Sequence, residues 1–236
     1  MWGGLLVSLL ESDLHIIRDD VTSPKNSRCN RNRIAGNSDI CWLTIPYDNF
    51  SSSKLIKDQY LQTTKRNNKK IISKYTSRYN SYPYFNCVRT LLENTLVVES
   101  EKTLLCEIYI NFLSQLKVLG FPLCKFIFAS SLSLNNKLEK KFNGVDMINQ
   151  ILKETGATHY LAAENTVNYA DPSEYYVQNV YLQKYEDLNF SLNNSELKGI
   201  SFTKNLSCLD IISCLSINET IEHLSNSNKW HKRVNY

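Results

Sequence analysis

A strand–helix–strand alternation in the second half of the chain constrains its fold more than any other feature. The segment CKFIFASSL at 124–132 is an apolar run, GVDMINQILKETG at 144–156 has helical spacing and ends in glycine, and THYLAA at 158–163 is a second short apolar run. Two such strands joined by a helix pair in parallel through a right-handed crossover. The sequence therefore predicts an α/β fold in one domain: a mixed or mostly parallel sheet with helices packed on it, closed by two C-terminal helices.

The remaining patterns predict further elements on both sides of this unit. They indicate a helix at 2–11, strands at 13–20, 41–47 and 56–63, a helix at 65–80, and a helix that starts after Pro83. The clearest helix covers 101–120 and carries one apolar stripe, formed by Leu105, Ile108, Phe112, Leu116 and Leu119. Gly120 fits the C′ position of this helix, and Asn218 fits the N-cap of the last helix.

Length and composition fit one globular domain. The chain has 236 residues, of which 42% are hydrophobic and 21% are charged, and this balance is ordinary for a folded domain. We assign residues 1–225 to one α/β domain and residues 226–236 to a polar, loose C-terminal tail. The formal net charge of +4 does not favour a nucleic-acid binder, which usually has a strongly basic face, but it suits a site for a small anion.

Cysteine usage and the apolar runs indicate a cytoplasmic protein. The seven cysteines are odd in number and scattered, and no Cys-x-x-Cys pair occurs, so we expect reduced thiols, with no disulfide framework and no metal site. The N-terminus lacks the basic region and the cleavage site of a signal peptide. No apolar run reaches the about 18 residues that a membrane helix needs, so we expect no membrane insertion.

Two adjacent acids, Asp19 and Asp20, close the strand predicted at 13–20. Ligands of open α/β sheets bind beyond the carboxyl ends of strands, where a carboxylate can accept a hydrogen bond, hold a cation or act as a general base. Neighbouring side chains of an extended chain point to opposite sides, so at most one of the two acids faces a given site. They are the candidate catalytic residues, and a structural or solvated role is the alternative.

A ladder of alternating asparagine and arginine follows at Asn30, Arg31, Asn32 and Arg33. If this segment is extended, the two arginines share one face and the two asparagines share the other. Two guanidinium groups on one face can bind the oxygens of a phosphate or diphosphate. The asparagines can bind hydroxyl or amide groups, or hold the local backbone. The alternative is an exposed polar edge strand whose charges discourage aggregation.

The order of these motifs resembles the WbqC-like family of bacterial surface-polysaccharide gene clusters. The resemblance is carried by the strand that ends in Asp-Asp-Val at 19–21, Lys25, NRNRI at 30–34 and WLTIPY at 42–47. It continues with YPYF at 82–85, GATHYLAA at 156–163 and NLSCLDIISCLSIN at 205–218. From it we add five candidate substrate-binding residues to the ladder: Lys25, Trp42, Tyr160, Ser207 and Asp210.

Family members usually begin with a strand that carries a His-Gln-Pro-type motif. This chain starts at Met1-Trp2-Gly3-Gly4, where that motif would end, so we expect a family member that lacks the first strand. None of the four histidines matches a family position. Proton transfer would then fall to a carboxylate, a thiol or the substrate itself.

The resemblance implies a cytoplasmic step in the assembly of O-antigen or a related glycan, and three functions stay open. The first is a transferase that moves a glycyl or other acyl group onto the amino group of a nucleotide-linked amino sugar. The second is an accessory protein that binds a sugar nucleotide or glycan without chemistry. The third and weakest is a nucleic-acid-processing protein that uses Asp19 and Asp20 with a metal and the basic segment 65–70. The sequence identifies no cofactor.

Overall fold

The computed structural model describes residues 3–35, 40–97, 100–133, 144–163, 166, 168, 170–183, 206–227 and 230–232. Within these ranges the helices are α1 Gly3–Glu11, α2 Lys65–Tyr79, α3 Phe85–Leu96, α4 Leu105–Val118, α5 Gly144–Glu154, α6 Cys208–Cys214 and α7 Ile217–Ser227. The strands are β1 Leu14–Ile17, β2 Arg31–Ile34, β3 Cys41–Thr44, β4 Tyr47–Asp48, β5 Tyr60–Gln62, β6 Lys102–Leu104, β7 Lys125–Phe128, β8 His159–Ala163, β9 Asn179–Gln183 and β10 Trp230–Lys232. Helices and strands mix along the chain, which confirms the predicted α/β class.

The described strands form four small sheets. β1 and β7 pair in parallel, and so do β8 and β9, whose second edge carries β10 in antiparallel orientation. β2 and β3 form an antiparallel ribbon, while β4, β5 and β6 form an antiparallel sheet. The expected crossover needs one correction. Within the described residues β7 and β8 do not pair with each other, because each finds its parallel partner in another strand.

Three local predictions are wrong in detail. The segment 56–63 is not one strand, since the 3₁₀ turn η1 (Ile56–Asp58) precedes β5. Helix α7 is capped by Ser216 and not by Asn218: the Ser216 hydroxyl accepts a hydrogen bond from the Glu219 N–H, and the Glu219 carboxylate accepts one from the Ser216 N–H. Residues 230–232 of the supposedly loose tail form β10, because the open edge of β9 offers unpaired backbone groups.

The main core joins residues from both ends of the chain. Leu105, Ile108, Phe112 and Leu116 of the predicted stripe on α4 are buried, and the last two belong to a cluster that also includes side chains of α1, α2, α3, α6 and α7. Burying one such side chain fully stabilises a fold by about 1.5–3 kcal/mol. Gly120 ends α4 with a φ of +101°, a conformation that favours glycine, as its predicted C′ position requires.

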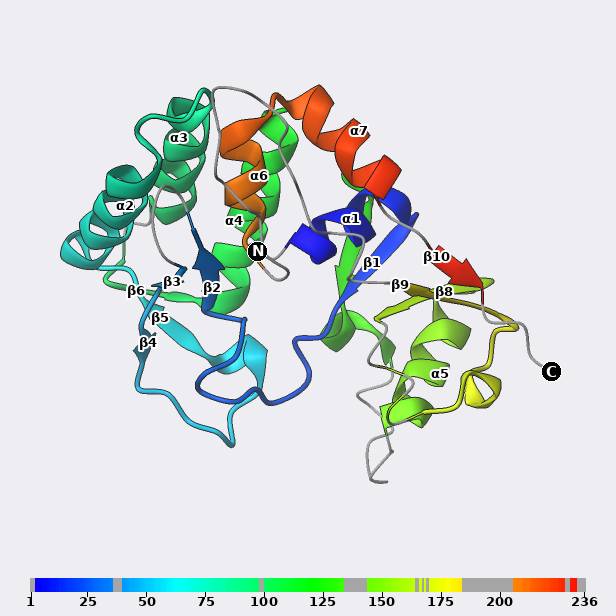
Figure 1. Cartoon of the computed structure of the whole chain (residues 1–236). Helices are drawn as coiled ribbons and strands as arrows, with labels where there is room; N and C mark the ends of the chain where they lie inside the picture. The colour runs from blue at the N-terminus through cyan, green and yellow to red at the C-terminus, as the bar shows by residue number, and fades with distance from the viewer. Residues whose placement is uncertain are drawn as a thin grey trace.

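Figure 1 shows how the elements surround the ribbon β2–β3. Helices α2, α3, α4 and α6 stand around the ribbon, whereas β1, β7, the sheet β8–β10 and α5 lie on the other side of the molecule. One loop leads from the end of β1 to the start of β2, and it is tied to η1. The Asp19 carbonyl accepts a hydrogen bond from the Lys57 N–H, and the Val21 carbonyl accepts one from the Ile56 N–H. The ribbon is therefore held in place at its entry.

Candidate functional site

The ribbon β2–β3 turns its two faces to different surroundings. Arg31 lies opposite Thr44 and Arg33 lies opposite Trp42, so these four side chains share the outer face. Asn30 and Asn32 point to the inner face and are each only 7% exposed. The alternation predicted for the ladder is therefore confirmed: the arginines are on one side and the asparagines are on the other.

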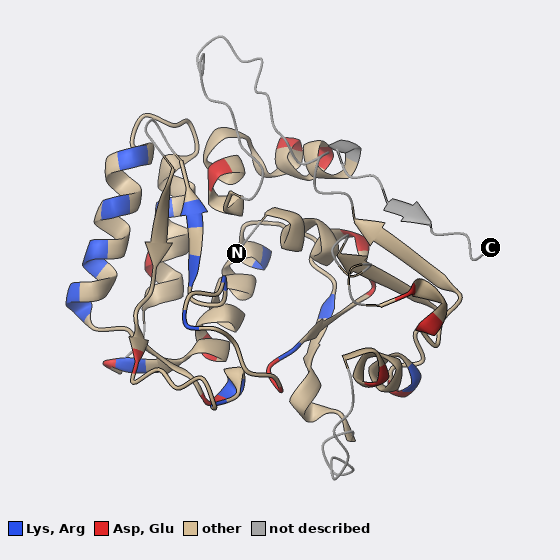
Figure 2. Ribbon diagram, turned by 60° about the horizontal axis from the view of Figure 1, so that its bottom comes forward, with Lys and Arg blue, Asp and Glu red and all other residues tan. Residues whose placement is uncertain are grey.

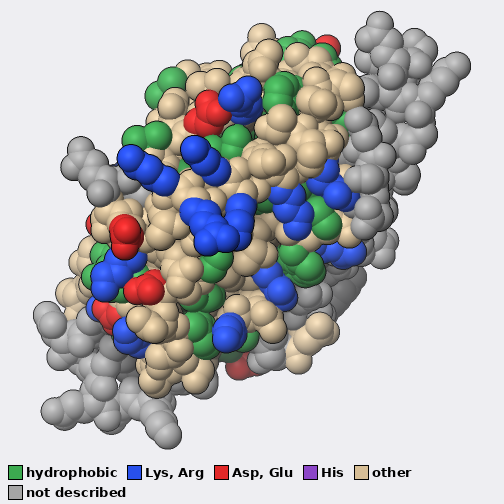
Figure 3. Space-filling view, turned by 90° about the vertical axis from the view of Figure 1, so that its left-hand side faces the viewer, with side chains coloured by type: hydrophobic (Ala, Val, Ile, Leu, Met, Phe, Trp, Pro, Cys, Tyr) green, Lys and Arg blue, Asp and Glu red, His purple; other side chains and the backbone are tan. Residues whose placement is uncertain are grey.

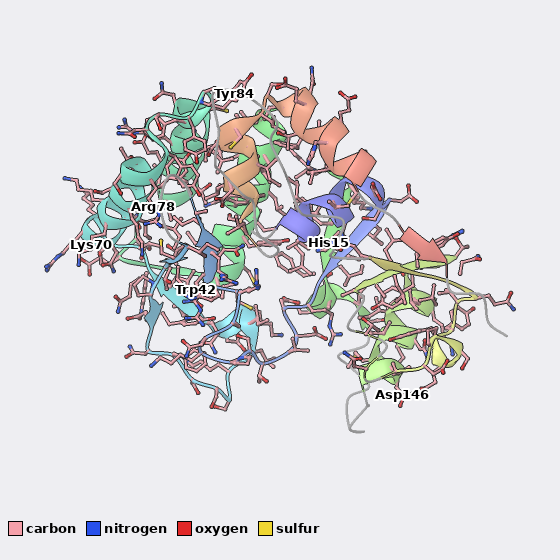
Figure 4. The ribbon with its side chains drawn as sticks, viewed as in Figure 1. His15, Trp42, Lys70, Arg78, Tyr84 and Asp146 are labelled. Atoms are coloured by element: carbon pink, nitrogen blue, oxygen red, sulfur yellow. The ribbon has the colours of Figure 1, made fainter. Side chains whose placement is uncertain are left out.

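The outer face combines a cation with an exposed aromatic ring. The guanidinium carbon of Arg31 lies 4.1 Å from the centre of the Trp42 ring, and its Nη2 donates a hydrogen bond of 2.8 Å to the Asn26 carbonyl. Trp42, labelled in Figure 4, is 37% exposed, and its own carbonyl accepts a hydrogen bond from the Lys74 ammonium at 2.7 Å. A guanidinium group held in this way can bind a phosphate while the neighbouring ring offers a stacking surface.

The inner face borders a cavity of about 120 Å³ between the ribbon and the helices around it. Its polar lining includes Asn30, Asn32 and Ser207, and its apolar walls come from side chains of four helices, among them Ile71 of α2, Leu92 of α3, Phe112 of α4 and Leu209 of α6. The exposed residues of the lining are Arg28 and Cys29. The mouth of the cavity therefore lies at the start of β2, next to Arg31, which also lines it.

Two asparagines at this cavity each keep a buried polar atom without a hydrogen-bond partner among the described residues: Oδ1 of Asn30 and Nδ2 of Asn32; Nε of Arg31, whose guanidinium lies on the outer face, also has none. The other amide atom of each asparagine is used. Asn30 Nδ2 donates to the Ile45 carbonyl at 2.9 Å, and Asn32 Oδ1 accepts from the Arg33 N–H at 2.9 Å and from Arg28 at 3.2 Å. A buried unpaired polar atom costs about 1–3 kcal/mol, so a ligand or a water molecule that pairs with these atoms would be stabilised here.

Ser207 reaches the same cavity from a distant part of the sequence. The residue before it, Leu206, forms a parallel bridge with Arg33. The Ser207 N–H then donates a hydrogen bond of 2.8 Å to the Arg33 carbonyl, and the Ser207 hydroxyl caps α6 by accepting from the Leu209 N–H at 3.3 Å. The start of α6 is thus fastened along β2. This pairing brings Ser207, which belongs to the family motif at 205–218, next to the ladder.

Asp210 is fully buried one turn further along α6 and acts on the ribbon through other groups. Its Oδ1 accepts hydrogen bonds from the Ala35 N–H at 2.9 Å and from the Tyr79 hydroxyl. Burial, and next the Asp210 charge, raise the pKa of Tyr79 far above its usual range, so the hydroxyl stays a donor. These contacts hold the end of β2 against α2 and α6. The geometry favours a positioning role for Asp210 over the direct substrate contact that we expected.

The two candidate catalytic acids, Asp19 and Asp20, each have a hydrogen-bond partner outside the ribbon. Asp19 is 3% exposed, and its carboxylate accepts hydrogen bonds from the Ser130 N–H at 2.9 Å and from the Ser130 hydroxyl at 2.5 Å. Asp20 pairs with Arg18 at 2.7 Å. Within the described residues no hydrogen bond or ion pair joins either acid to Arg31 or Arg33. That the acids and the arginines meet on one bound ligand therefore stays a prediction.

The thiol of Cys106, in the first turn of α4, lies in the electrostatic neighbourhood of Asp19 and Cys29. Burial, followed by the charges of Asp19, Cys29, Asp58 and Glu107, raises the pKa of Cys106 to about 11. A thiol with this pKa is protonated at neutral pH and is a weak nucleophile. The surroundings of Cys106 therefore do not support a role for its thiol as a nucleophile that would carry an acyl group as a thioester.

Two predicted site residues lie apart from the cavity. Tyr160, in β8, belongs to a second hydrophobic cluster, where its ring lies 5.1 Å from that of Tyr175. Lys25 is exposed in a turn of the loop that precedes β2. Neither residue lines the cavity. The mouth residues Arg28 and Cys29 were missed by the sequence analysis, although Arg28 stands just before the ladder and continues its basic pattern.

A basic surface on α2 is separate from this cavity. Its residues are Lys65, Arg66, Lys69, Lys70 and Lys74, which line a shallow depression together with Ser73 and Ser77. In Figure 2 blue segments recur along the ribbon of this helix, and Figure 3 shows blue Lys and Arg side chains on the side of the molecule where the helix lies. The asparagine amides of α2 are used inside the fold, since Asn67 donates to Gln62 and Asn68 to the carbonyls of Thr63 and Leu96. The surface therefore offers charge without amide groups for reading bases.

The described residues contain neither a metal-binding cluster nor a membrane-spanning helix. No group of three or more His, Cys, Asp and Glu side chains there could hold a metal ion. No helix in the described ranges has both the length and the apolar character needed to cross a membrane.

Fold and site together define an α/β protein with a small cavity that is lined by amide side chains and flanked by arginines. The chain belongs to the WbqC-like protein family, whose model matches residues 2–222, nearly the whole sequence. No curated protein and no solved structure gives a significant match. Both the ladder and the Ser207 segment lie inside the matched region, so the cavity is part of what the family match covers.

Proposed function

We propose that this chain is a cytoplasmic transferase of bacterial surface-polysaccharide synthesis, which moves a glycyl or other acyl group onto the amino group of a nucleotide-linked amino sugar. Membership of the WbqC-like family supports the pathway. One observation carries the site: Asn30, Arg31, Asn32 and Ser207, which come from two motifs far apart in the sequence, line one cavity. Buried amides that lack partners are expected where a polar ligand completes them.

The size of the cavity limits which part of the substrate enters it. Ligand pockets usually measure about 300–1,000 Å³, whereas this cavity measures about 120 Å³. Only a small group therefore fits inside, and the nucleotide stays outside, near the mouth. There Arg28 and Arg31 supply guanidinium groups for the diphosphate, and the outer face adds Arg33 and the Trp42 ring.

The reaction requires one bond to form, one bond to break and one proton to move. The sugar amine nitrogen bonds to the acyl carbonyl carbon, the bond between that carbon and the leaving group of the donor breaks, and the amine loses a proton to a base. Asp19 and Asp20 are the candidate bases. Ser130 donates one hydrogen bond to each carboxylate oxygen of Asp19, and each oxygen keeps a second lone pair that can take the proton.

Isothermal titration calorimetry with UDP- and dTDP-linked amino sugars tests the site. Arg31→Ala should weaken binding by about 10- to 150-fold, because hydrogen bonds to charged groups contribute about 1.5–3 kcal/mol each. Arg89→Ala is the matched control, since Arg89 lies on the exposed surface of α3 and pairs only with Glu93 among the described residues. Equal affinities for the wild type and Arg31→Ala would remove the proposed diphosphate site.

A second candidate function is binding without chemistry, and the contacts of the acids favour it. Both oxygens of Asp19 accept hydrogen bonds from Ser130, and Asp20 is held by Arg18. An accessory protein would bind the sugar nucleotide tightly and release no acylated product. A turnover assay with Asp19→Asn and Asp20→Asn separates the two functions. Loss of product at unchanged affinity supports the transferase, whereas tight binding by a wild type that forms no product supports the accessory protein.

A further inference from the structure

We infer that the cavity behind β2 binds a secondary amide, which in this setting is the N-acylamino group of an acylated amino sugar. The inference rests on the proposed function and deepens it, because it names the chemical group that enters the cavity. Its basis is the pair Asn30 and Asn32, which are buried to more than nine-tenths and line the same cavity from the same face of β2.

The two asparagines offer one acceptor and one donor, and their neighbours fix which is which. Asn30 must turn Nδ2 to the Ile45 carbonyl, so the atom without a partner is the acceptor Oδ1. Asn32 must turn Oδ1 to the Arg33 N–H and to Arg28, so the atom without a partner is the donor Nδ2. A secondary amide has one N–H and one C=O. Its N–H can donate to Asn30 Oδ1 while its C=O accepts from Asn32 Nδ2, so one amide satisfies both asparagines at once.

The dimensions of the site agree with this group. Asn30 immediately precedes β2 and Asn32 lies within it, and both line the cavity, so an amide between the two side chains can meet one partner on each side. The cavity measures about 120 Å³, which is below the usual size of a pocket for a whole ligand, so it suits a small group. An acetamido group is a small group of this kind. Its methyl group would meet the apolar walls, which include Ile71, Leu92 and Phe112.

The location of the mouth explains which side of the sugar stays outside. Arg28 and Cys29 are the exposed lining residues, and Arg31 stands beside them with a buried Nε that has no partner among the described residues. A sugar whose acylamino group enters the cavity would leave its ring at the mouth and its phosphates near these two arginines. A free amine is ammonium at neutral pH. It would meet the cations of the mouth and the donor of Asn32, so the cavity holds an acylamino group that is already formed, on the sugar or on the product, and the amine to be acylated lies outside it.

Calorimetry with UDP-N-acetylglucosamine and UDP-glucosamine tests this preference. The acetamido ligand should bind at least about tenfold more tightly, since a buried site rejects a ligand that leaves its polar groups unpaired. Asn32→Asp keeps the acceptor for Arg33 and Arg28 but replaces the donor, and it should abolish the preference. Asn94→Asp adds the same charge on the exposed face of α3 and should not change it. Equal affinities for the two ligands would overturn the inference while leaving the nucleotide-sugar site intact.

A second arm uses small amides and does not depend on nucleotide binding or on a variant. In NMR spectra of the wild type, N-methylacetamide should shift the side-chain NH₂ signals of Asn30 and Asn32 in a saturable manner, and N,N-dimethylacetamide, which lacks the N–H, should do so more weakly. Thr95→Ile, which fills the cavity from α3, should remove both shifts. S-acetyl-N-acetylcysteamine tests whether the amide can instead come from an acyl donor. If the small amides bind but no sugar nucleotide does, the amide site stands and the proposed function fails. If N-methylacetamide leaves both asparagine signals unmoved, the inference is wrong.

Discussion

Removing the Tyr79 hydroxyl should destabilise the protein by about 1.5–3 kcal/mol, the usual contribution of a hydrogen bond to a charged group. Tyr79 and Asp210 are both 0% exposed, so water cannot replace the lost donor. The Phe ring of Tyr79→Phe would keep the stacking on Tyr75, whose ring lies 4.7 Å away, and the loss is confined to the hydroxyl. Because Asp210 also accepts from the Ala35 N–H, the variant should loosen the end of β2 as well.

Urea unfolding followed by circular dichroism measures this loss as a lower midpoint at an unchanged slope. Tyr82→Phe is a matched control, because the Tyr82 hydroxyl is buried without a hydrogen-bond partner among the described residues and its ring lies 5.1 Å from Tyr79. Its stability should change by less than about 0.5 kcal/mol. In a double-mutant cycle, Tyr79→Phe and Asp210→Asn should couple by about 1–2 kcal/mol. Equal effects of the two Tyr→Phe changes, with no coupling, would refute the role given to Asp210.

Three further perturbations test separate parts of the structure. Burial lowers the pKa of His15 from its usual 6.5, so the free energy of unfolding should fall as the pH drops below that value. The decrease is at most about 1.4 kcal/mol per pH unit for one proton, and urea titrations of His15→Phe should show a flatter dependence on pH. Cys29 is exposed at the mouth whereas Cys214 is buried, so mass spectrometry should find that N-ethylmaleimide alkylates Cys29 first. This labelling should abolish ligand binding in the wild type but not in Cys29→Ser. Binding that persists after full labelling of Cys29 would place the ligand elsewhere. The basic surface of α2 should bind DNA only weakly, and this binding should disappear as the salt concentration rises. The double change Lys69→Glu and Lys70→Glu should abolish it in fluorescence anisotropy. Tight binding that resists salt would support the nucleic-acid function.

The sequence could predict those features that depend on local periodicity. The two-residue period of an extended chain was enough to separate Arg31 and Arg33 from Asn30 and Asn32, and the helical period was enough to find the buried stripe of α4. Glycine's tolerance of positive φ was enough to place the end of that helix at Gly120. These properties are set within a few residues, so they can be read without knowing the tertiary structure.

The features that the sequence did not reveal depend on contacts between distant segments. The walls of the cavity come from four helices, and its polar lining joins Asn32 to Ser207, which is attached to the ladder only through the backbone bond to Arg33. For Asp19 the sequence left a catalytic and a structural role open, because it could not show that Ser130, more than a hundred residues away, donates hydrogen bonds to both oxygens of its carboxylate. Both Ser216 and Asn218 are residue types that cap helices, and their positions in the sequence did not show that Ser216 caps α7.

A crystal structure with bound UDP-N-acetylglucosamine tests the central claim most directly. The account predicts electron density at the start of β2, with the acetamido group between Asn30 and Asn32 and the diphosphate within hydrogen-bond distance of Arg28 or Arg31. Density at a different place, such as the cluster around Tyr160 or the basic surface of α2, with the cavity behind the ribbon left empty, would contradict it.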